Sequence, residues 1–176
     1  MILDDHLKSN LSVVFCGTAA GDRSAARGYF YAGPGNKFWP MLHRTGLTPQ
    51  RLLPEDGYRV CAFGIGLTDL AKHHSGSDAS LKRDMFDVAA FERKIHEYRP
   101  RFVAFNGKKA AATYLGVRSA TLEFGHHERK VGLARIFVLP STSGAANGSW
   151  VEQPWHDLAA LISAGTPQAP LNHARV

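Results

Sequence analysis

Residues 13–39 read VVFCGTAAGDRSAARGYFYAGPGNKFW, and this stretch decides how the chain is expected to fold. It begins with an apolar, β-branched run that predicts a buried strand over about residues 12–16. A loop rich in glycine and small residues follows, then an aromatic cluster, and a helix is expected to begin near Asn36. Open α/β sheets bind ligands at the carboxyl ends of their strands, so the same stretch predicts a binding site.

The length and composition predict a single domain. A chain of 176 residues can bury a core without disulfides or metals, and 44% hydrophobic with 20% charged residues is ordinary for a globular protein. We expect one domain over residues 1–165. Residues 166–176 contain Pro167 and Pro170 and are expected to form a flexible tail.

The charge and the apolar runs narrow the choice of partner and compartment. A net charge of +6 points to an acidic partner, most simply nucleic acid, although solvated basic surfaces are the alternative. Cys16 and Cys61 lie in apolar runs and are interpreted as reduced core residues. No apolar run has the length of a membrane span, and the first ten residues lack a signal-peptide pattern, so we expect a cytoplasmic protein without membrane contact.

Further apolar runs alternate between strand and helix patterns. Additional strands are expected over residues 58–63, 101–105 and 134–139. Helices are expected over residues 36–46, 48–53, 87–98, 108–115 and 151–164. Residues 126–130 are interpreted as a hairpin or a loop tip, and residues 64–70 as a turn.

This alternation predicts the α/β class. We expect a three-layer α/β/α sandwich with a mainly parallel central sheet of about four strands. The loops at the strand ends, over residues 17–34, 64–69, 106–109 and 140–148, are expected to gather along one edge of the sheet.

The opening stretch resembles the first signature of the uracil-DNA glycosylase superfamily, closest to its mismatch-specific and thymine-DNA branch. Residues 17–21, GTAAG, stand where that branch has a Gly-Ile-Asn-Pro-Gly-like turn, and Ser24-Ala25 match its Ser-Ala pair. Residues 32–39, AGPGNKFW, match its Ala-x-Pro-x-Asn-Arg-Phe-Trp ending, after the aromatic patch at residues 29–31. Residues 140–146, PSTSGAA, are similar to the second motif, often Asn/His-Pro-Ser-Gly/Pro-Leu-Ser. The resemblance implies the same sandwich fold and removal of uracil from DNA, without a cofactor.

The resemblance also implies roles for residues in both loops. Enzymes that act on a base in DNA swing its nucleotide out of the stack, and Tyr31 is expected to stack on the extruded base. Backbone N–H groups of the first turn are expected to approach the uracil and stabilise the departing anion. The predicted substrate-binding residues are Gly17, Thr18, Ala19, Gly21, Tyr31, Ser141 and Ser143. The predicted DNA-binding residues are Ser24, Lys37, Lys108, Gly144, Ala145 and Asn147.

Three positions depart from the family pattern. Ala19 replaces the Asn that orients the hydrolytic water, and a methyl group cannot position water. Ser141 stands where the second motif begins with Asn or His, and Ala145 replaces the Leu wedge that fills the vacated base site. The usual mechanism therefore cannot be transferred unchanged.

Three residues could take over the role of the missing Asn. Asp22 is ranked first as the catalytic residue, because a carboxylate can hold water and stabilise an oxocarbenium-like sugar. Asn36 is the second candidate, since a related hypoxanthine-removing branch is thought to rely on an Asn in this segment, although capping of the helix is the simpler role. Asp69 is a third, weaker candidate.

No metal is expected, because the pairs His73-His74 and His126-His127 lack cysteine partners at zinc spacing.

We expect a monomer whose partner is DNA containing uracil or another deaminated base. Two other functions stay open: a lesion-binding protein of the same fold that cleaves slowly or not at all, and a small enzyme acting on free nucleotides.

Overall fold

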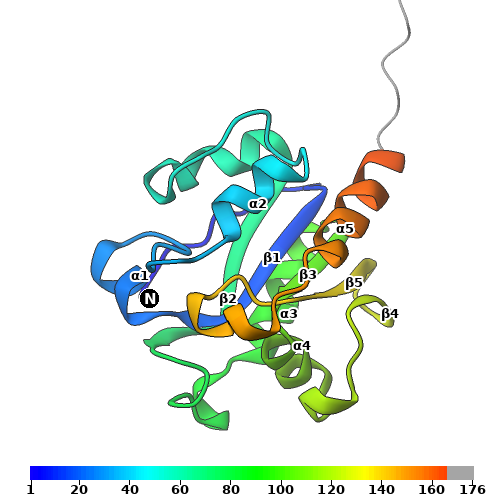
Figure 1. Cartoon of the computed structure of the whole chain (residues 1–176). Coiled ribbons are helices and arrows are strands. Elements are labelled where there is room, and N and C mark those ends of the chain that lie inside the picture. Colours follow the sequence, from blue (N-terminus) through cyan, green and yellow to red (C-terminus); the bar gives the residue numbers. More distant parts are fainter. Residues whose placement is uncertain (166–176) are drawn as a thin grey trace, which may run out of the picture.

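The centre of the molecule is a five-stranded sheet in the order β2-β1-β3-β5-β4 (Figure 1). Four strands are parallel: β1 (Val13–Ala20), β2 (Ile65–Ser75), β3 (Phe102–Asn106) and β5 (Ala134–Leu139). The edge strand β4 (Gly125–Val131) is antiparallel to β5. The computed structural model describes residues 1–165, and the tail predicted over residues 166–176 lies outside this range. The predicted mainly parallel sheet is confirmed, with five strands instead of about four.

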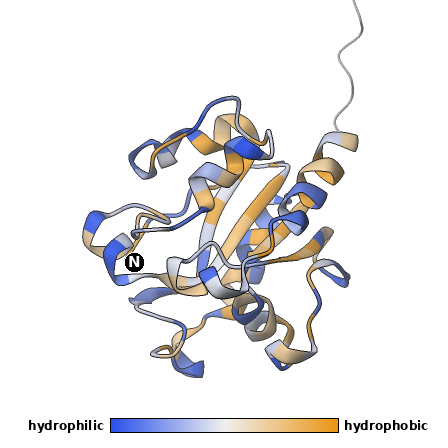
Figure 2. Ribbon diagram, viewed as in Figure 1, coloured by the Kyte–Doolittle hydropathy of each residue, from blue (hydrophilic) through white to orange (hydrophobic). Residues whose placement is uncertain are grey.

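Helices cover both faces of this sheet. On one face α2 (Phe38–Arg44) and α5 (Gln153–Ala164) contribute to the same apolar cluster as Val13 and Phe15 of β1. On the other face α3 (Val88–Tyr98) and α4 (Lys108–Leu115) pack with Val14 and Cys16. Successive residues of a strand point to opposite faces, and β1 supplies both cores in this way. The three-layer α/β/α arrangement is therefore confirmed, and Figure 2 shows its apolar residues concentrated on the central strands.

The remaining helical elements are short. They are α1 (Asp22–Arg27) and the 3-10 helices η1 (Pro54–Phe63), η2 (Arg83–Met85), η3 (Ser119–Thr121) and η4 (Gly144–Ser149). Helix α1 was not predicted, and β1 runs four residues beyond the predicted end at Cys16. Residues 17–20 therefore continue the strand in place of the expected loop.

The predictions for residues 48–70 were wrong. Residues 48–53 form no helix, and the expected strand over 58–63 is part of η1, which begins at Pro54, because the fixed φ of proline suits the first position of a helix. The expected turn over 64–70 is the first half of β2. Gly66 had suggested a turn, but a Cβ atom there would lie 2.8 Å from Cδ1 of Leu11 and 3.0 Å from the carbonyl oxygen of His6. This glycine allows the N-terminal segment to approach the strand.

That N-terminal segment pairs with the outer edge of β2. The His6 N–H donates to the carbonyl of Leu67 at 3.0 Å, and the Leu67 N–H donates back to His6 at 2.9 Å. The backbone groups of an edge strand need such partners or water. The segment therefore closes the β2 side of the sheet next to the site described below.

Several other predictions can be compared with the structure directly. The strand over residues 134–139 is confirmed, as is the helix after Asp87, whose carboxylate accepts the N–H of Ala90 at 2.8 Å. Residues 126–130 form most of β4, the first strand of a hairpin with β5, so the hairpin interpretation is confirmed and the loop-tip alternative was wrong. Within residues 1–165 there is no helix that is both long and apolar enough to cross a membrane.

Trp155 lies at the centre of the core shared by α2 and α5. It is fully buried, stacks on Phe15 with 5.4 Å between ring centroids, and meets Phe38 edge-on at 6.0 Å. We expect Trp155→Ala to lower the free energy of unfolding by about 3–5 kcal/mol, because it removes a large buried side chain and leaves a cavity. Chemical denaturation measures this change. Leu133→Ala, at an 84% exposed turn position, is the control and should cost less than about 0.5 kcal/mol; equal losses for both variants would contradict the packing.

Candidate functional site

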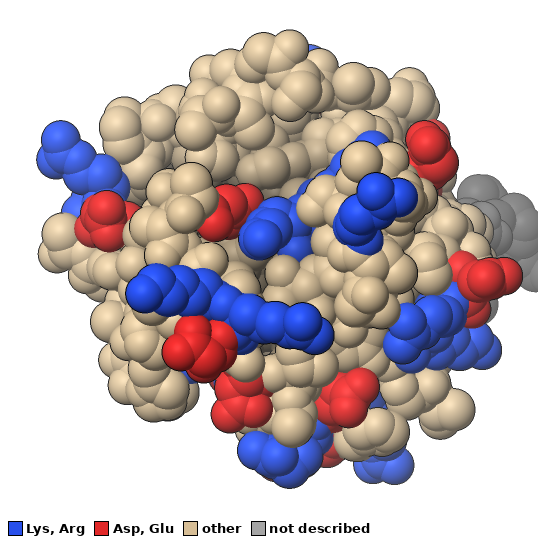
Figure 3. Space-filling model, turned by 90° about the horizontal axis from the view of Figure 1, so that it is seen from below, with Lys and Arg blue, Asp and Glu red and all other residues tan. Residues whose placement is uncertain are grey.

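A cavity of about 720 Å³ opens where the parallel strands end. It is bordered by the end of β1 with α1, by the loop after β2, by the end of β3 and by the loop after β5, and the segment before α2 completes it. The predicted gathering of loops along one edge is confirmed, except that residues 64–69 are strand and residues 76–79 take the place of a border loop. Figure 3 looks onto this edge and shows Lys and Arg side chains interspersed with Asp and Glu.

Most of the predicted site residues line this cavity. They are Ala19, Gly21, Asp22, Ser24, Tyr31, Asn36, Asp69, Ser141, Ser143, Gly144 and Ala145. The structure thus brings together two segments that are more than a hundred residues apart in the chain. Gly17, Thr18, Lys37, Lys108 and Asn147 lie outside the lining.

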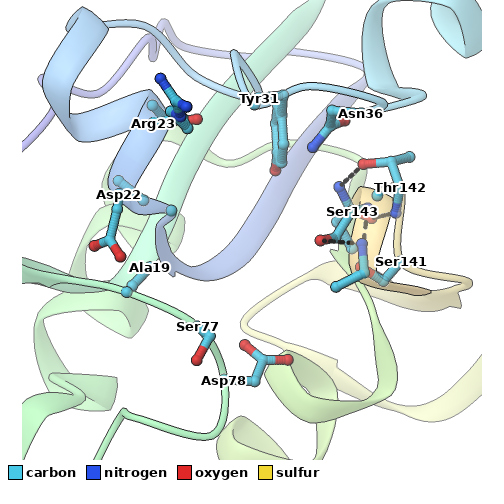
Figure 4. A pocket seen from close by; sticks show the side chains of 18 of the residues that line it. Ala19, Asp22, Arg23, Tyr31, Asn36, Ser77, Asp78, Ser141, Thr142 and Ser143 are labelled. Atoms are coloured by element: carbon cyan, nitrogen blue, oxygen red, sulfur yellow. Dashed lines mark hydrogen bonds between the residues drawn. The ribbon is translucent and has the colours of Figure 1, made fainter. Parts of the chain in front are cut away.

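Tyr31 projects into the cavity from the segment before α2 (Figure 4). One face of its ring stacks on Phe38, with 3.9 Å between centroids and 25° between planes. A ligand in the cavity would therefore meet the hydroxyl, the ring edge or the opposite face. The backbone of Tyr31 has φ +53°, a left-handed conformation that is unfavourable for a bulky residue and is often found at functional sites. Its hydroxyl oxygen is buried and has no hydrogen-bond partner in the described part of the chain.

Beside Tyr31, the cavity ends against the carboxyl group of Asp69 on β2. Gly17 of β1 is paired with Asp69 across the parallel strands. A Cβ atom on Gly17 would lie 2.6 Å from Oδ1 of Asp69 and 3.6 Å from the hydroxyl of Tyr31. Only glycine leaves room for the carboxyl group here. Asp69, ranked third from the sequence, is the most buried of the three catalytic candidates, with 4% exposure.

The environment of Asp69 changes its protonation. Burial raises the pKa of Asp69 to about 6, and the positive charge of Lys72 works in the opposite direction. Lys72 is in turn bound by Asp5, whose carboxylate lies 2.7 Å from the ammonium of Lys72 and 2.6 Å from that of Lys94. Burial alone would raise the pKa of Asp5, but the hydrogen bonds from these lysines outweigh it and lower the pKa. Asp69 therefore titrates near neutral pH while Asp5 stays ionised.

Thr142 is the buried centre of a hydrogen-bond network that joins three segments of the wall. Its N–H donates to Oδ1 of Asn106 at 3.0 Å, and Nδ2 of Asn106 donates to its hydroxyl at 2.8 Å. Its carbonyl accepts the N–H of Lys37 at 2.9 Å. The end of β3, the loop after β5 and the start of α2 are thus held together through the backbone and side chain of one residue with no exposure to solvent.

Two further contacts fix the loop after β5. A Cβ atom on Gly144 would lie 2.8 Å from the carbonyl oxygen of Pro34, so glycine is needed where the two signature segments meet. At the other end of the loop, the indole N–H of Trp155 donates to the carbonyl of Pro140 at 3.2 Å. The loop is therefore anchored on both sides of Ser141 and Ser143.

Asp22 and Asn36, ranked first and second as catalytic, both line the cavity; Asn36 lies beside Tyr31, and Asp22 lies on α1, apart from both (Figure 4). Asp22 begins α1, is exposed, and accepts a hydrogen bond from the Ser75 hydroxyl at 3.4 Å. Asn36 uses Oδ1 to accept the N–H of Phe38 at 3.0 Å, but the N-cap position of α2 is Lys37, so the helix begins later than predicted and Asn36 is not its N-cap. Its amide nitrogen faces the cavity in Figure 4.

Several predicted DNA contacts are engaged within the protein. The Ser24 hydroxyl accepts the N–H of Ala32 at 3.0 Å, and the residue is 6% exposed. The Lys37 ammonium contacts Oδ1 of Asn147 and lies 5.3 Å from the ring centroid of Trp150. The Lys108 ammonium lies 4.5 Å from the ring centroid of Phe124. Their contacts with DNA stay predictions.

Sequence reasoning missed three residues of the site: Asn106, Thr142 and Asp78. Asp78 accepts a 2.6 Å hydrogen bond from the Thr18 hydroxyl at the rim of the cavity. Asn106 directly follows the strand predicted over residues 101–105, but its pairing with a residue 36 positions away could not be recognised. Among residues 1–165, no three His, Cys, Asp or Glu side chains are grouped so that they could hold a metal.

Comparison with known proteins finds a family model and a solved structure that are similar to this chain. The family model of the uracil DNA glycosylase superfamily matches residues 5–161. Among solved structures, the solution NMR structure of a candidate uracil DNA glycosylase from Methanosarcina acetivorans is similar, with a TM-score of 0.63 and 22% sequence identity. The match covers 92% of this chain and 95% of that protein.

The network around Thr142 yields a prediction about the loop after β5. Asn106→Ala removes both hydrogen bonds to Thr142, so we expect the amide of Thr142 to exchange faster with solvent and the free energy of unfolding to fall by about 1–3 kcal/mol. Hydrogen exchange followed by NMR measures this, with the amides of Val103 and Ala104 in β3 as the internal reference. Asn106→Asp is the matched control, because its carboxylate can still accept from the N–H and the hydroxyl. Unchanged exchange at Thr142 in Asn106→Ala would show that the network does not hold the loop.

Proposed function

The chain belongs to the uracil DNA glycosylase superfamily, and on this premise we propose that it hydrolyses the N-glycosidic bond of uracil in DNA and leaves an abasic site. The observation that supports this most directly is the cavity at the strand ends, where a stacking residue, Tyr31, lies beside a buried polar group, Asp69. A base turned out of the DNA stack needs a flat surface and a polar partner for its edge. No cofactor is required for such a hydrolysis.

In this proposal Asp69 contacts the edge of the base. Uracil presents an N–H group next to a carbonyl oxygen on the edge opposite to its sugar. A neutral carboxyl group can accept from the N–H and donate to the carbonyl, and the pKa of about 6 makes this form available in mildly acidic solution. Gly17 donates its N–H to Asp69 and so helps to fix the orientation of the carboxyl group.

Asp22 and Asn36 remain our candidates for the position of the hydrolytic water. Glycosidic hydrolysis passes through a sugar with positive charge at its reacting carbon, and a carboxylate near that carbon stabilises it. Asp22 is exposed at the cavity and bound only to a hydroxyl, so it can hold water where Ala19 cannot. The amide nitrogen of Asn36 can donate to the same water, while its oxygen accepts the N–H of Phe38.

Excision assays test the proposal. Oligonucleotides that carry uracil, hypoxanthine or a thymine mismatch are incubated with excess protein, and the free base is quantified. We expect release of uracil, and slowing by about 10²- to 10⁴-fold in Asp22→Asn, the range for loss of a group that handles the reacting proton. Asn36→Ala is the comparison variant, and Asp157→Asn, on the exposed side of α5, is the control. Specific binding of uracil DNA without release would instead identify a lesion-binding protein.

The short distance between Gly17 and the carboxyl group of Asp69 allows a second test of the proposal, in which two glycine substitutions are compared. Gly17→Ala places a methyl group against Oδ1 of Asp69, so we expect uracil release to fall by about 10²-fold, the effect of a displacement of about 1 Å at a reacting site. Gly148→Ala, outside the lining of the cavity, is the matched control, because no atom lies within 4 Å of its added Cβ. Release rates are measured under single-turnover conditions. Equal rates for the two variants would remove Asp69 from the proposed base contact.

A further inference from the structure

The charge of the cavity differs in sign from that of the whole chain. Its lining contains three carboxylates, Asp22, Asp69 and Asp78, and one guanidinium, Arg23. No Lys or His belongs to the lining formed by residues 1–165. The chain as a whole carries +6. Figure 4 shows Asp22 on α1 at one side of the cavity and Asp78 at another part of its rim, below Ser141.

This charge affects how readily a base can leave. Uracil that departs without a proton is an anion, and nearby carboxylates raise the energy of that anion, most strongly where water is excluded. A base that is already cationic departs as a neutral molecule. Before departure its positive charge is attracted by the same carboxylates. The buried carboxylate of Asp69 has the largest effect, since the exposed ones are screened by solvent.

Tyr31 adds a second feature that suits a cation. The electron-rich face of an aromatic ring attracts a positive charge, by more when the pair is shielded from water. One face of the Tyr31 ring is covered by Phe38, and the hydroxyl oxygen is buried without a partner in the described chain, next to Asp69. An unpaired buried hydroxyl is costly, and a ligand polar group would satisfy it.

We propose that this cavity also accepts cationic, N-alkylated purines in DNA, such as 7-methylguanine, and releases them as neutral bases. The proposal rests on the proposed glycosylase function of the same cavity and adds a second class of substrate. In the reaction, the oxygen of water forms a bond to C1′ of the deoxyribose. The bond between C1′ and the purine nitrogen breaks, and its electron pair neutralises the positive ring. The proton of the water passes to solvent through the open side of the cavity.

Asp69 makes the two substrate classes respond to pH in opposite directions. The charged or titratable groups that face it are Lys72 on its own strand, Asp5 in the N-terminal segment, Lys94 on α3, Cys16 on β1 and Tyr31. Together with burial they leave the pKa of Asp69 at about 6. The ionised form above this pH attracts a cationic purine, whereas the neutral form below it can donate a hydrogen bond to uracil. Release of the cation should therefore rise with pH, and release of uracil should fall.

The experiment compares two duplexes of identical sequence, one with 7-methylguanine and one with uracil, from pH 5 to pH 8. Single-turnover release of each base is measured with excess protein and corrected for loss without protein. We expect release of 7-methylguanine to rise about tenfold over this range, as a carboxyl group with a pKa near 6 becomes ionised. Asp69→Asn should lower that release by about 10- to 100-fold and abolish its pH dependence. The same variant should also remove the pH dependence of uracil release, because an amide does not titrate between pH 5 and pH 8.

Two more variants test whether a loss of base release reflects misfolding or the loss of a specific interaction. Tyr31→Leu removes the aromatic face without changing the carboxylates and should also lower release of 7-methylguanine. Asp157→Asn, which changes the same charge at a distant exposed site, should not. Thermal unfolding of each variant identifies any loss of structure.

The outcomes separate the two proposals. Release of uracil alone would overturn the cationic substrate and leave the proposed function intact. Release of 7-methylguanine that is equal in wild type and Asp69→Asn would overturn the role of the acidic cavity. Release of 7-methylguanine alone, with the expected response of Asp69→Asn, would support this inference and overturn the preference for uracil. Release of neither base would overturn both.

Discussion

The structure depends on a close approach between two parallel strands where they end. Gly17 and Asp69 are paired across β1 and β2, and the absence of a side chain at Gly17 makes room for the carboxyl group and for the Tyr31 hydroxyl. A buried carboxyl group is costly unless it is protonated or paired. Here the N-terminal segment contributes to the balance, because Asp5 binds both Lys72 and Lys94 and limits the positive charge that reaches Asp69. The edge pairing of residues 2–6 with β2 is thus part of the chemistry of the site as well as of the sheet.

The opposite wall of the cavity is organised by hydrogen bonds instead of charge. All three polar groups of Thr142 are bonded to residues from two other segments. A fully satisfied buried network of this kind favours a single conformation, since breaking any bond leaves a polar group unpaired away from water. Trp155 extends the same constraint to the core, because its ring packs on Phe15 while its N–H binds the carbonyl of Pro140. Packing of α5 on the sheet therefore also positions the loop that borders the cavity.

The sequence was informative wherever the deciding interactions are local. Alternation and β-branched residues located β5 to the residue, and Asp87 marked the start of α3. It failed at residues 54–70, where glycines serve a close approach between segments and resemble turn signals. The same limit explains why Asp69 was ranked last of three: its burial and its contact with Gly17 arise only from strand pairing. Asn106 and Thr142 were missed for the same reason, because their partners lie far away in the chain.

The departures from the family pattern are consistent with one another in electrostatic terms. In the family pattern the first motif carries the Asn that orients the hydrolytic water, and the second motif begins with Asn or His. This chain has Ala19 and Ser141 at those places, and it has carboxylates at Asp22, Asp69 and Asp78. Neither Ala19 nor Ser141 brings positive charge toward the base, while the carboxylates increase the stabilisation of positive charge on the sugar and on a cationic ring. In such a cavity, catalysis depends more on stabilising positive charge on the sugar than on stabilising negative charge on the departing base. The bases that benefit most are those whose departure creates no negative charge.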